Sequence, residues 1–171
     1  SWLVAESLPL DRRGRACVTL AGVLPDLDGL GAPVEALSGG ALPWFSTWHH
    51  VLCHNLTFVL IVAVLTVLWT RKPWVGLAAL VTGHLHLLAD VAGARGPDGH
   101  QWPIPYLAPF SMEGWTWSGQ WALNAWPNLV ITLVCVAITA WLARQRGRSP
   151  AEIISLRLDA RVVGLAGGTP P

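Results

Sequence analysis

Carboxylates and imidazoles occur in three short clusters of this chain, and together they are the side chains that bind zinc and other divalent metals. Asp26 and Asp28 form the first cluster, one residue apart after an apolar segment that ends in a proline. Two carboxylates at this spacing can turn toward one cation, and they are also common as caps of a helix end. We interpret the pair as candidate metal ligands.

Three histidines within six residues form the second cluster, at the beginning of a long apolar segment. They are His49, His50 and His54. On a regular helix His50 and His54 share a face, whereas His49 and His54 converge only if His49 precedes the helix. This density of histidines favours metal binding over ordinary packing, with hydration at a membrane surface as the alternative. We predict that His49 and His54 are ligands.

The third cluster lies inside an apolar segment, where His86 precedes Asp90 by four residues. This spacing places both side chains on one helical face. Ionisable groups in an apolar helix are costly unless they pair or bind an ion, so the two form either a metal site or a structural hydrogen bond. Asp90 can bind the ion itself or orient His86. We expect His84 to contact a neighbouring helix and His100 to face solvent.

The composition predicts a membrane protein. The chain is 53% hydrophobic and only 12% charged, whereas soluble domains carry about 25% charged residues. A net charge of +1 gives no electrostatic basis for binding a nucleic acid. The three cysteines are isolated, so neither a disulfide framework nor a thiolate zinc site is indicated. The 11 tryptophans suit an aromatic belt at the membrane surface.

Apolar segments of membrane-spanning character predict an all-α polytopic membrane helix bundle. Three are long enough to be clear transmembrane helices, at residues 54–70, 74–92 and 121–143. The segment 16–25 is too short to span and predicts a shorter helix from Arg12 to Pro25 within the bundle. The first ten residues read as the end of another helix. We expect Pro127 to begin or kink the last span.

The basic residues predict the orientation of these helices. If each span crosses in turn, ten of the eleven Lys and Arg residues fall on one face, which is then the cytoplasmic face. The six histidines and six of the ten carboxylates, Asp98 among them, fall on the other face, with Arg95 as the one basic exception. The loop 93–120 on that face is long enough to be a lid or binding segment.

We divide the chain into a membrane-embedded domain, residues 1–148, which carries the metal site, and a cytoplasmic tail, residues 149–171. Ser149, Pro150 and Glu152 have the order of residues at a helix N-terminus, which predicts a short amphipathic C-terminal helix in that tail.

In order, the motifs are PDLD, H-x-x-x-x-H, G-x-x-HLLAD and a loop of W-P-P-F-S type. They resemble a family of small bacterial inner-membrane proteins described as membrane-bound metal-dependent hydrolases, also called the LexA-binding, inner-membrane-associated hydrolase family. The family motif H-R-x-x-T-H-S corresponds to residues 49–55, in which both outer histidines remain but the Arg, Thr and Ser are replaced. The family's H-x-x-x-D matches His86 and Asp90. The resemblance also implies a histidine in a first helix, which would lie upstream of Ser1.

These observations predict a metal centre at the non-cytoplasmic end of the bundle. Its expected ligands are Asp26, Asp28, His49, His54, His86 and Asp90. The imidazoles favour one or two zinc ions, with manganese or iron as alternatives. The sequence leaves open whether the other histidines join the centre.

The expected chemistry is metal-assisted hydrolysis, with Asp28 or Asp90 as general base. A position at the bilayer surface suggests a lipid or a lipid-linked phosphoester or ester as substrate. The alternative is a protein without enzymatic activity, either a scaffold or a metal-binding or transport protein. The long apolar segments offer few polar residues for a transport path. The sequence does not determine the oligomeric state.

Overall fold

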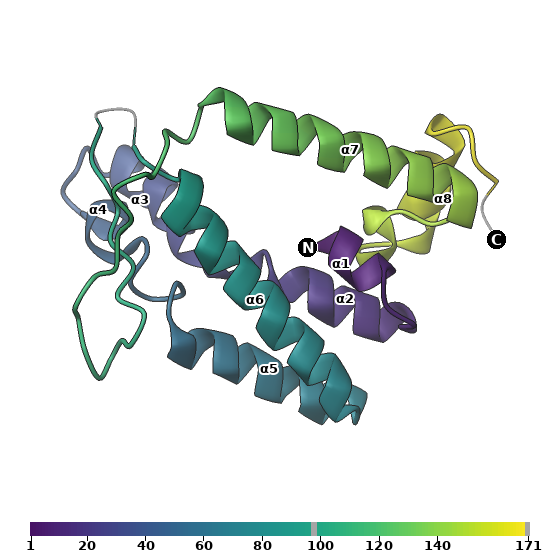
Figure 1. Ribbon diagram of the computed structural model, residues 1–171, viewed down its shortest axis with the longest axis horizontal. Helices are drawn as coiled ribbons and strands as arrows, with labels where there is room; N and C mark the ends of the chain where they lie inside the picture. The colour runs from purple at the N-terminus through teal and green to yellow at the C-terminus, as the bar shows by residue number, and fades with distance from the viewer. Residues whose placement is uncertain (97–98, 170–171) are drawn as a thin grey trace.

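The computed structural model describes residues 1–96 and 99–169, which form helices joined by one long loop (Figure 1). The helices in order are α1 (Trp2–Glu6), α2 (Arg12–Ala21), the 3-10 helix η1 (Leu24–Leu30), α3 (Gly31–Leu37), α4 (Trp44–Trp48), α5 (Leu56–Thr70), α6 (Pro73–Gly93), α7 (Trp126–Arg146), the 3-10 helix η2 (Pro150–Ile153) and α8 (Leu156–Leu165). In these two ranges, β-pairing is limited to isolated bridges within the long loop and its flanks. The all-α expectation is therefore confirmed, and Asp98 lies outside the described residues.

Local sequence signals set the ends of the long helices. Asn55 caps α5 by accepting a hydrogen bond from the backbone N–H of Phe58 (2.8 Å). Pro73 and Pro127 lie in the first turns of α6 and α7, where a missing N–H costs little. Gly147, with φ of 67°, ends α7 in the left-handed conformation that glycine adopts without steric cost. Pro127 therefore begins the last span, as expected, and does not kink it.

The expectation of three clear spans is wrong. Within the described residues, α6 and α7 are long and apolar enough to cross a membrane, and α2 with the 24–37 segment makes a third candidate bent by 51°. The predicted span 54–70 is α5, which has 15 residues and begins only at Leu56. At 1.5 Å per residue its length is about 22 Å, shorter than a hydrocarbon core of about 30 Å. Residues 54 and 55, which the predicted span included, are polar and precede the helix.

Glycines allow α5 and α6 to pack closely against each other. A Cβ at Gly76 would lie 2.3 Å from a methyl of Val67, and one at Gly83 would lie 2.7 Å from a methyl of Val59. Small residues at such contacts let helices approach within a membrane. The approach matters for the metal centre because Gly83 lies directly before His84 and three residues before His86.

The helix α7 stands apart from α5 and α6 (Figure 1). Ala143 is its only buried residue, and large apolar side chains such as Leu133 and Val136 are exposed along its length. Its contact partner is α8, which lies beside its C-terminal half. An apolar helix with so little protein contact is suited to a lipid environment.

Ion pairs join the basic end of the bundle. Glu6 of α1 contacts Arg146 (2.9 Å) and Arg148 (2.8 Å), and its side chain is fully buried. Arg15 of α2 binds both carboxylate oxygens of Glu152 at 2.6 Å. These contacts bring the N-terminal helices, the end of α7 and η2 together, so most of the basic clusters predicted to share one face do lie at one end.

The C-terminal segment forms two elements where one helix was expected. Ser149 caps η2 by accepting a hydrogen bond from the N–H of Ala151, and Ser155 caps α8 in the same way from Arg157. The carboxylate of Asp159 binds both the N–H and the hydroxyl of Ser149 at 2.6 Å. A second cap at Ser155 interrupts the helix, because its backbone is extended.

We predict that Glu6→Gln lowers the stability of the protein by roughly 3–5 kcal/mol, because it leaves several guanidinium groups without their buried counter-charge. Asp11→Asn is the matched control. Its ion pair with Lys72 is about half exposed, so its loss should cost less than about 1 kcal/mol. Thermal unfolding of the detergent-purified variants measures both, and equal losses would contradict the structural role of Glu6.

Candidate metal centre

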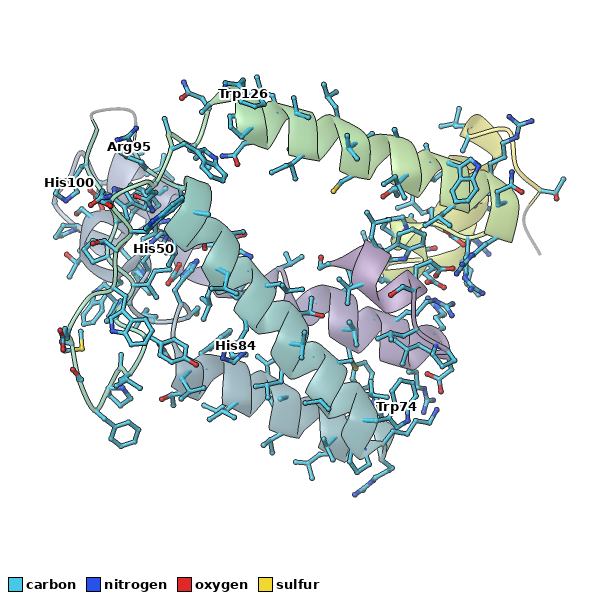
Figure 2. All side chains as sticks on the ribbon, in the orientation of Figure 1. His50, Trp74, His84, Arg95, His100 and Trp126 are labelled. Atoms are coloured by element: carbon cyan, nitrogen blue, oxygen red, sulfur yellow. The ribbon has the colours of Figure 1, made fainter. Side chains whose placement is uncertain are left out.

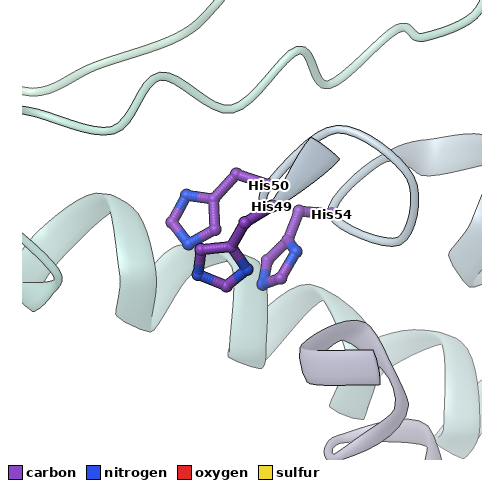
Figure 3. Close-up of side chains that lie close together, drawn as sticks. All are labelled: His49, His50 and His54. Atoms are coloured by element: carbon purple, nitrogen blue, oxygen red, sulfur yellow. The ribbon is translucent and has the colours of Figure 1, made fainter. Parts of the chain in front are cut away.

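Three elements supply the side chains of the candidate centre. The 3-10 helix η1 carries Asp26 and Asp28, the turn between α4 and α5 carries the three neighbouring histidines, and α6 carries His86 and Asp90. Figure 3 shows the rings of the turn gathered beside α6. The turn is not helical: α4 ends at Trp48, α5 begins at Leu56, and His50 has a φ of 67°.

The helical spacing argument for His50 and His54 is therefore wrong, although the two side chains do lie together. Their ring centroids are 4.3 Å apart, and the rings of His49 and His50 are at the same separation. A turn with one residue in the left-handed region brings them together more tightly than a helix would. That conformation is uncommon for a residue other than glycine and marks a backbone held by its surroundings.

The carboxylate of Asp28 orients two imidazoles at once. Its Oδ1 accepts a hydrogen bond from Nδ1 of His49 (2.8 Å), and its Oδ2 lies 3.1 Å from Nδ1 of His54. The backbone N–H of Cys53 also donates to Oδ2 (3.2 Å), and the Asp28 side chain has no exposed area. With the proton on Nδ1 in each ring, both Nε2 atoms keep a lone pair, which is the form that binds a metal.

A backbone carbonyl orients His86 so that its Nε2, too, is free to bind a metal. Nδ1 of His86 lies 3.1 Å from the carbonyl oxygen of Gly22, the residue that caps the C-terminus of α2. Carbonyls at a helix end have no partner within the helix and are available as acceptors. The Nε2 lone pair of His86 then points toward His54, and the two Nε2 atoms are 3.4 Å apart.

Carboxylate oxygens complete this group. Oδ2 of Asp90 lies 3.1 Å from Nε2 of His86 and 3.2 Å from Nε2 of His54. Oδ1 of Asp26 lies 3.5 Å from Nε2 of His86 and 3.9 Å from Nε2 of His54. Zinc bonds of 2.0–2.1 Å in a tetrahedron place ligand atoms about 3.3 Å apart. The distances among Nε2 of His54, Nε2 of His86 and Oδ2 of Asp90, which are 3.1, 3.2 and 3.4 Å, therefore fit a single ion.

The orientation of these atoms also fits an ion. Oδ2 of Asp90 is buried and makes no hydrogen bond among the described residues, despite its short distances to two imidazole nitrogens. A bound metal ion would satisfy this oxygen, since a ligand atom needs no hydrogen bond to the other ligands. A buried carboxylate oxygen without a hydrogen bond would otherwise be costly.

Negative charge dominates the surroundings of His54. Burial alone would lower the pKa of this imidazole, but the adjoining carboxylates of Asp28 and Asp90 outweigh burial and raise the pKa above its usual value. Three aspartates close to two imidazoles favour the presence of positive charge, which a divalent cation can supply as well as a proton can.

His50 belongs to a second group of possible ligands, together with His49 and His54, whose ligand atoms lie within 4.8 Å of one another. Burial, followed by the nearby imidazoles, lowers the pKa of His50 to about 4, so this side chain is neutral at pH 7. The Nδ1 atom of His50 is buried and makes no hydrogen bond among the described residues. Both groups contain His54, and since its Nδ1 faces Asp28, only its Nε2 is available to a metal.

A cavity of about 550 Å³ adjoins the histidine turn. Its wall combines His49 and His50 with aromatic and apolar side chains, including Phe45, Trp102 and Met112. The ring of His49 stacks on Phe45 (4.5 Å between centroids) and meets the edge of Trp102 at 4.8 Å. Phe45 is only four residues before His49, whereas Trp102 comes from the long loop after α6, so its contact with this histidine could not be read from the sequence.

The long loop between α6 and α7 covers this cavity and is tied to the bundle. His84 contacts the hydroxyl of Tyr106 through Nε2 (2.9 Å) and the Leu80 carbonyl through Nδ1 (2.8 Å). Thr57 of α5 donates to the carbonyl of Ala108 (2.7 Å). His84 thus holds the loop and lies outside the metal group, whereas exposed His100 lines the cavity.

The fold and the centre together define a class: an all-helical membrane protein in which a histidine-rich group could hold a metal ion. The sequence profile of the YdjM inner membrane protein family matches residues 2–163. The chain therefore belongs to the YdjM inner membrane protein family. Neither a curated protein nor a solved structure matches the chain significantly.

We predict that Asp28→Asn weakens zinc binding at this centre by about 10–100-fold, the usual effect of losing a residue that orients a histidine ligand. An amide cannot accept hydrogen bonds from two imidazoles with both of its polar atoms. Competition with a chromogenic chelator measures the affinity. Cys53→Ser is the control, because only its backbone contacts Asp28, and unchanged zinc affinity in Asp28→Asn would contradict this role.

Proposed function

We propose that this chain is a metal-dependent hydrolase that acts at the membrane surface on a lipid or a lipid-linked phosphoester or ester. The observation that carries the proposal is the convergence of Nε2 of His54, Nε2 of His86 and Oδ2 of Asp90 at 3.1–3.4 Å from one another. Two imidazoles and a carboxylate, with one further position open, are the protein ligands of many catalytic zinc sites.

We assign the three atoms as the ligands of one zinc ion. A zinc ion in such a site activates a bound water and polarises the group to be hydrolysed. Asp28 and the Gly22 carbonyl orient the two histidines, so Asp28, expected from the sequence as a ligand or base, acts here as a positioning residue. His49 shares that carboxylate and faces the cavity.

Asp26 is the best placed general base. Its side chain is 61% exposed, and its Oδ1 lies farther from the two Nε2 atoms than Oδ2 of Asp90 does. An exposed carboxylate at the open side of the group can accept a proton from water and release it to solvent. Asp90, the other carboxylate expected to act as base, is more buried and lies between two histidines.

The surroundings of the centre support an amphiphilic substrate. The adjoining cavity has an aromatic and apolar wall, and large apolar side chains such as Phe110 and Trp48 are exposed at the same end of the molecule. A lipid-like molecule would place its apolar part in such a cavity and its polar linkage near the histidines. The LexA-binding property implied by the resemblance stays a prediction.

We predict that His86→Ala and His54→Ala lose bound metal and all hydrolysis. Elemental analysis of the detergent-purified protein should find about one zinc per chain in the wild type and in His84→Ala, which alters the same helix but leaves the ligand atoms in place. Hydrolysis is measured with bis(p-nitrophenyl) phosphate, p-nitrophenyl butyrate and mixed micelles of bacterial phospholipids. Manganese or iron in place of zinc would change the ion assigned, and full activity without metal would refute the proposal.

Asp26→Asn separates metal binding from catalysis. We expect this variant to keep its zinc, because three ligands remain, and to lose about 10²–10⁴-fold in turnover, the usual contribution of a general base. Glu35→Gln, at an exposed carboxylate that binds Ser46 instead, is the control and should retain activity. A protein that binds zinc but hydrolyses none of these substrates would favour a structural role for the metal.

A further inference from the structure

A depression of about 590 Å³ lies next to the cavity beside the histidine turn, and we propose that it binds an oxyanion, either a phosphoryl or a carboxylate group, carried by the substrate. Among the described residues that line it are Arg95, His100, Thr116 and Ser118, and no acidic side chain is among them. This composition contrasts with the neighbouring centre, where three aspartates cluster. The inference rests on the proposed function only for the statement that the oxyanion belongs to the substrate.

Arg95 supplies the charge. It is the one basic residue of eleven that the sequence places away from the basic end. Among the described residues, no carboxylate lies within ion-pair distance of its guanidinium, whereas Arg15, Arg146 and Arg148 all bind buried acids. A guanidinium has five donors in a planar arrangement that matches carboxylate and phosphate oxygens.

The backbone holds Arg95 in a fixed place. Its N–H donates to the carbonyl of Trp121 (3.2 Å), and its own carbonyl accepts from the N–H of Leu123 (2.9 Å). The N–H of Gly96 donates to the carbonyl of His100 (3.0 Å), and this contact brings His100 close to Arg95. Figure 2 shows both side chains at the same end of the molecule as His50.

Hydroxyl groups also line the depression. Thr116 and Ser118 follow the segment in which Ile104 and Trp115 exchange two backbone hydrogen bonds (3.0 and 2.8 Å). The amide of Gln101 donates to the carbonyl of Trp117 (2.7 Å) and ties the two arms of the loop together. A guanidinium and hydroxyls that line the same depression can donate hydrogen bonds to one oxyanion.

The depression adjoins the cavity beside the histidine turn. His100 and Pro103 line both, so a single ligand can extend from one to the other. A substrate that reaches the metal group with its hydrolysable linkage would place a second, anionic group near Arg95. The substrate class is therefore an amphiphile with an oxyanion separate from the bond that is cleaved.

Calorimetric titration of the full chain in detergent with inorganic phosphate, after treatment with chelator, tests the binding itself. We expect Arg95→Gln to weaken phosphate binding by about tenfold or more, the usual effect of losing a charged hydrogen-bond donor. Arg13→Gln removes an exposed arginine at the opposite end and should bind phosphate like the wild type. Thr116→Val, a milder change of the same depression, should weaken binding less than Arg95→Gln.

His86→Ala keeps this experiment independent of the metal proposal, because it should bind phosphate normally while it loses zinc. Short-chain dihexanoyl phosphatidic acid replaces inorganic phosphate in a second titration, and tighter binding of the lipid identifies a headgroup as the source of the oxyanion. Equal binding identifies a free phosphate and contradicts the assignment of the oxyanion to the substrate. Absence of phosphate binding by the wild type, or the same affinity in folded Arg95→Gln, overturns the inference even if zinc and hydrolysis are found.

Discussion

The buried carboxylate of Asp28 is the contact on which the geometry of the candidate centre depends. It joins η1 to the turn before α5 and accepts hydrogen bonds from two imidazoles and one backbone N–H. A charge without exposed area is tolerated only if its oxygens are satisfied, so this carboxylate and the histidines fix each other. The Nε2 atom of His54 faces His86 and Asp90 as a direct result.

The apolar helices separate two polar ends that have opposite chemistry. At one end, buried Glu6 and Glu152 neutralise arginines from α2, from the last residue of α7 and from the segment that follows it. At the other, aspartates exceed the nearby basic residues, and a divalent cation would restore the balance. Between the ends, glycines of α6 let this helix pack closely on α5. This close packing determines where His86 lies relative to the histidine turn. The cytoplasmic side of the basic end and the division of the chain at residue 148 stay predictions.

Sequence patterns succeeded where the physics is local. The helix α6 was expected at 74–92 and is observed at Pro73–Gly93, and the pairing of His86 with Asp90 follows from its periodicity. Sequence patterns failed to predict where helices begin and end. The sequence places residues 54 and 55 in a predicted span. The turn at residues 49–54 and the capping side chain of Asn55 instead make α5 begin only at Leu56. The C-terminal helix was divided for a similar reason, a second cap at Ser155.

The sequence by itself determined which ligand-type side chains are present, that the chain is helical and apolar, and that α6 presents one histidine and one aspartate on the same face. Only the tertiary structure decided which nitrogen of each imidazole faces the centre, and that Asp26 and Asp28 lie on different sides of His54. The reason is that a tautomer is set by the partner of the opposite nitrogen. Those partners, Asp28 for His54 and the Gly22 carbonyl for His86, are 26 and 64 residues away along the chain. No local pattern of residues encodes contacts at such separations.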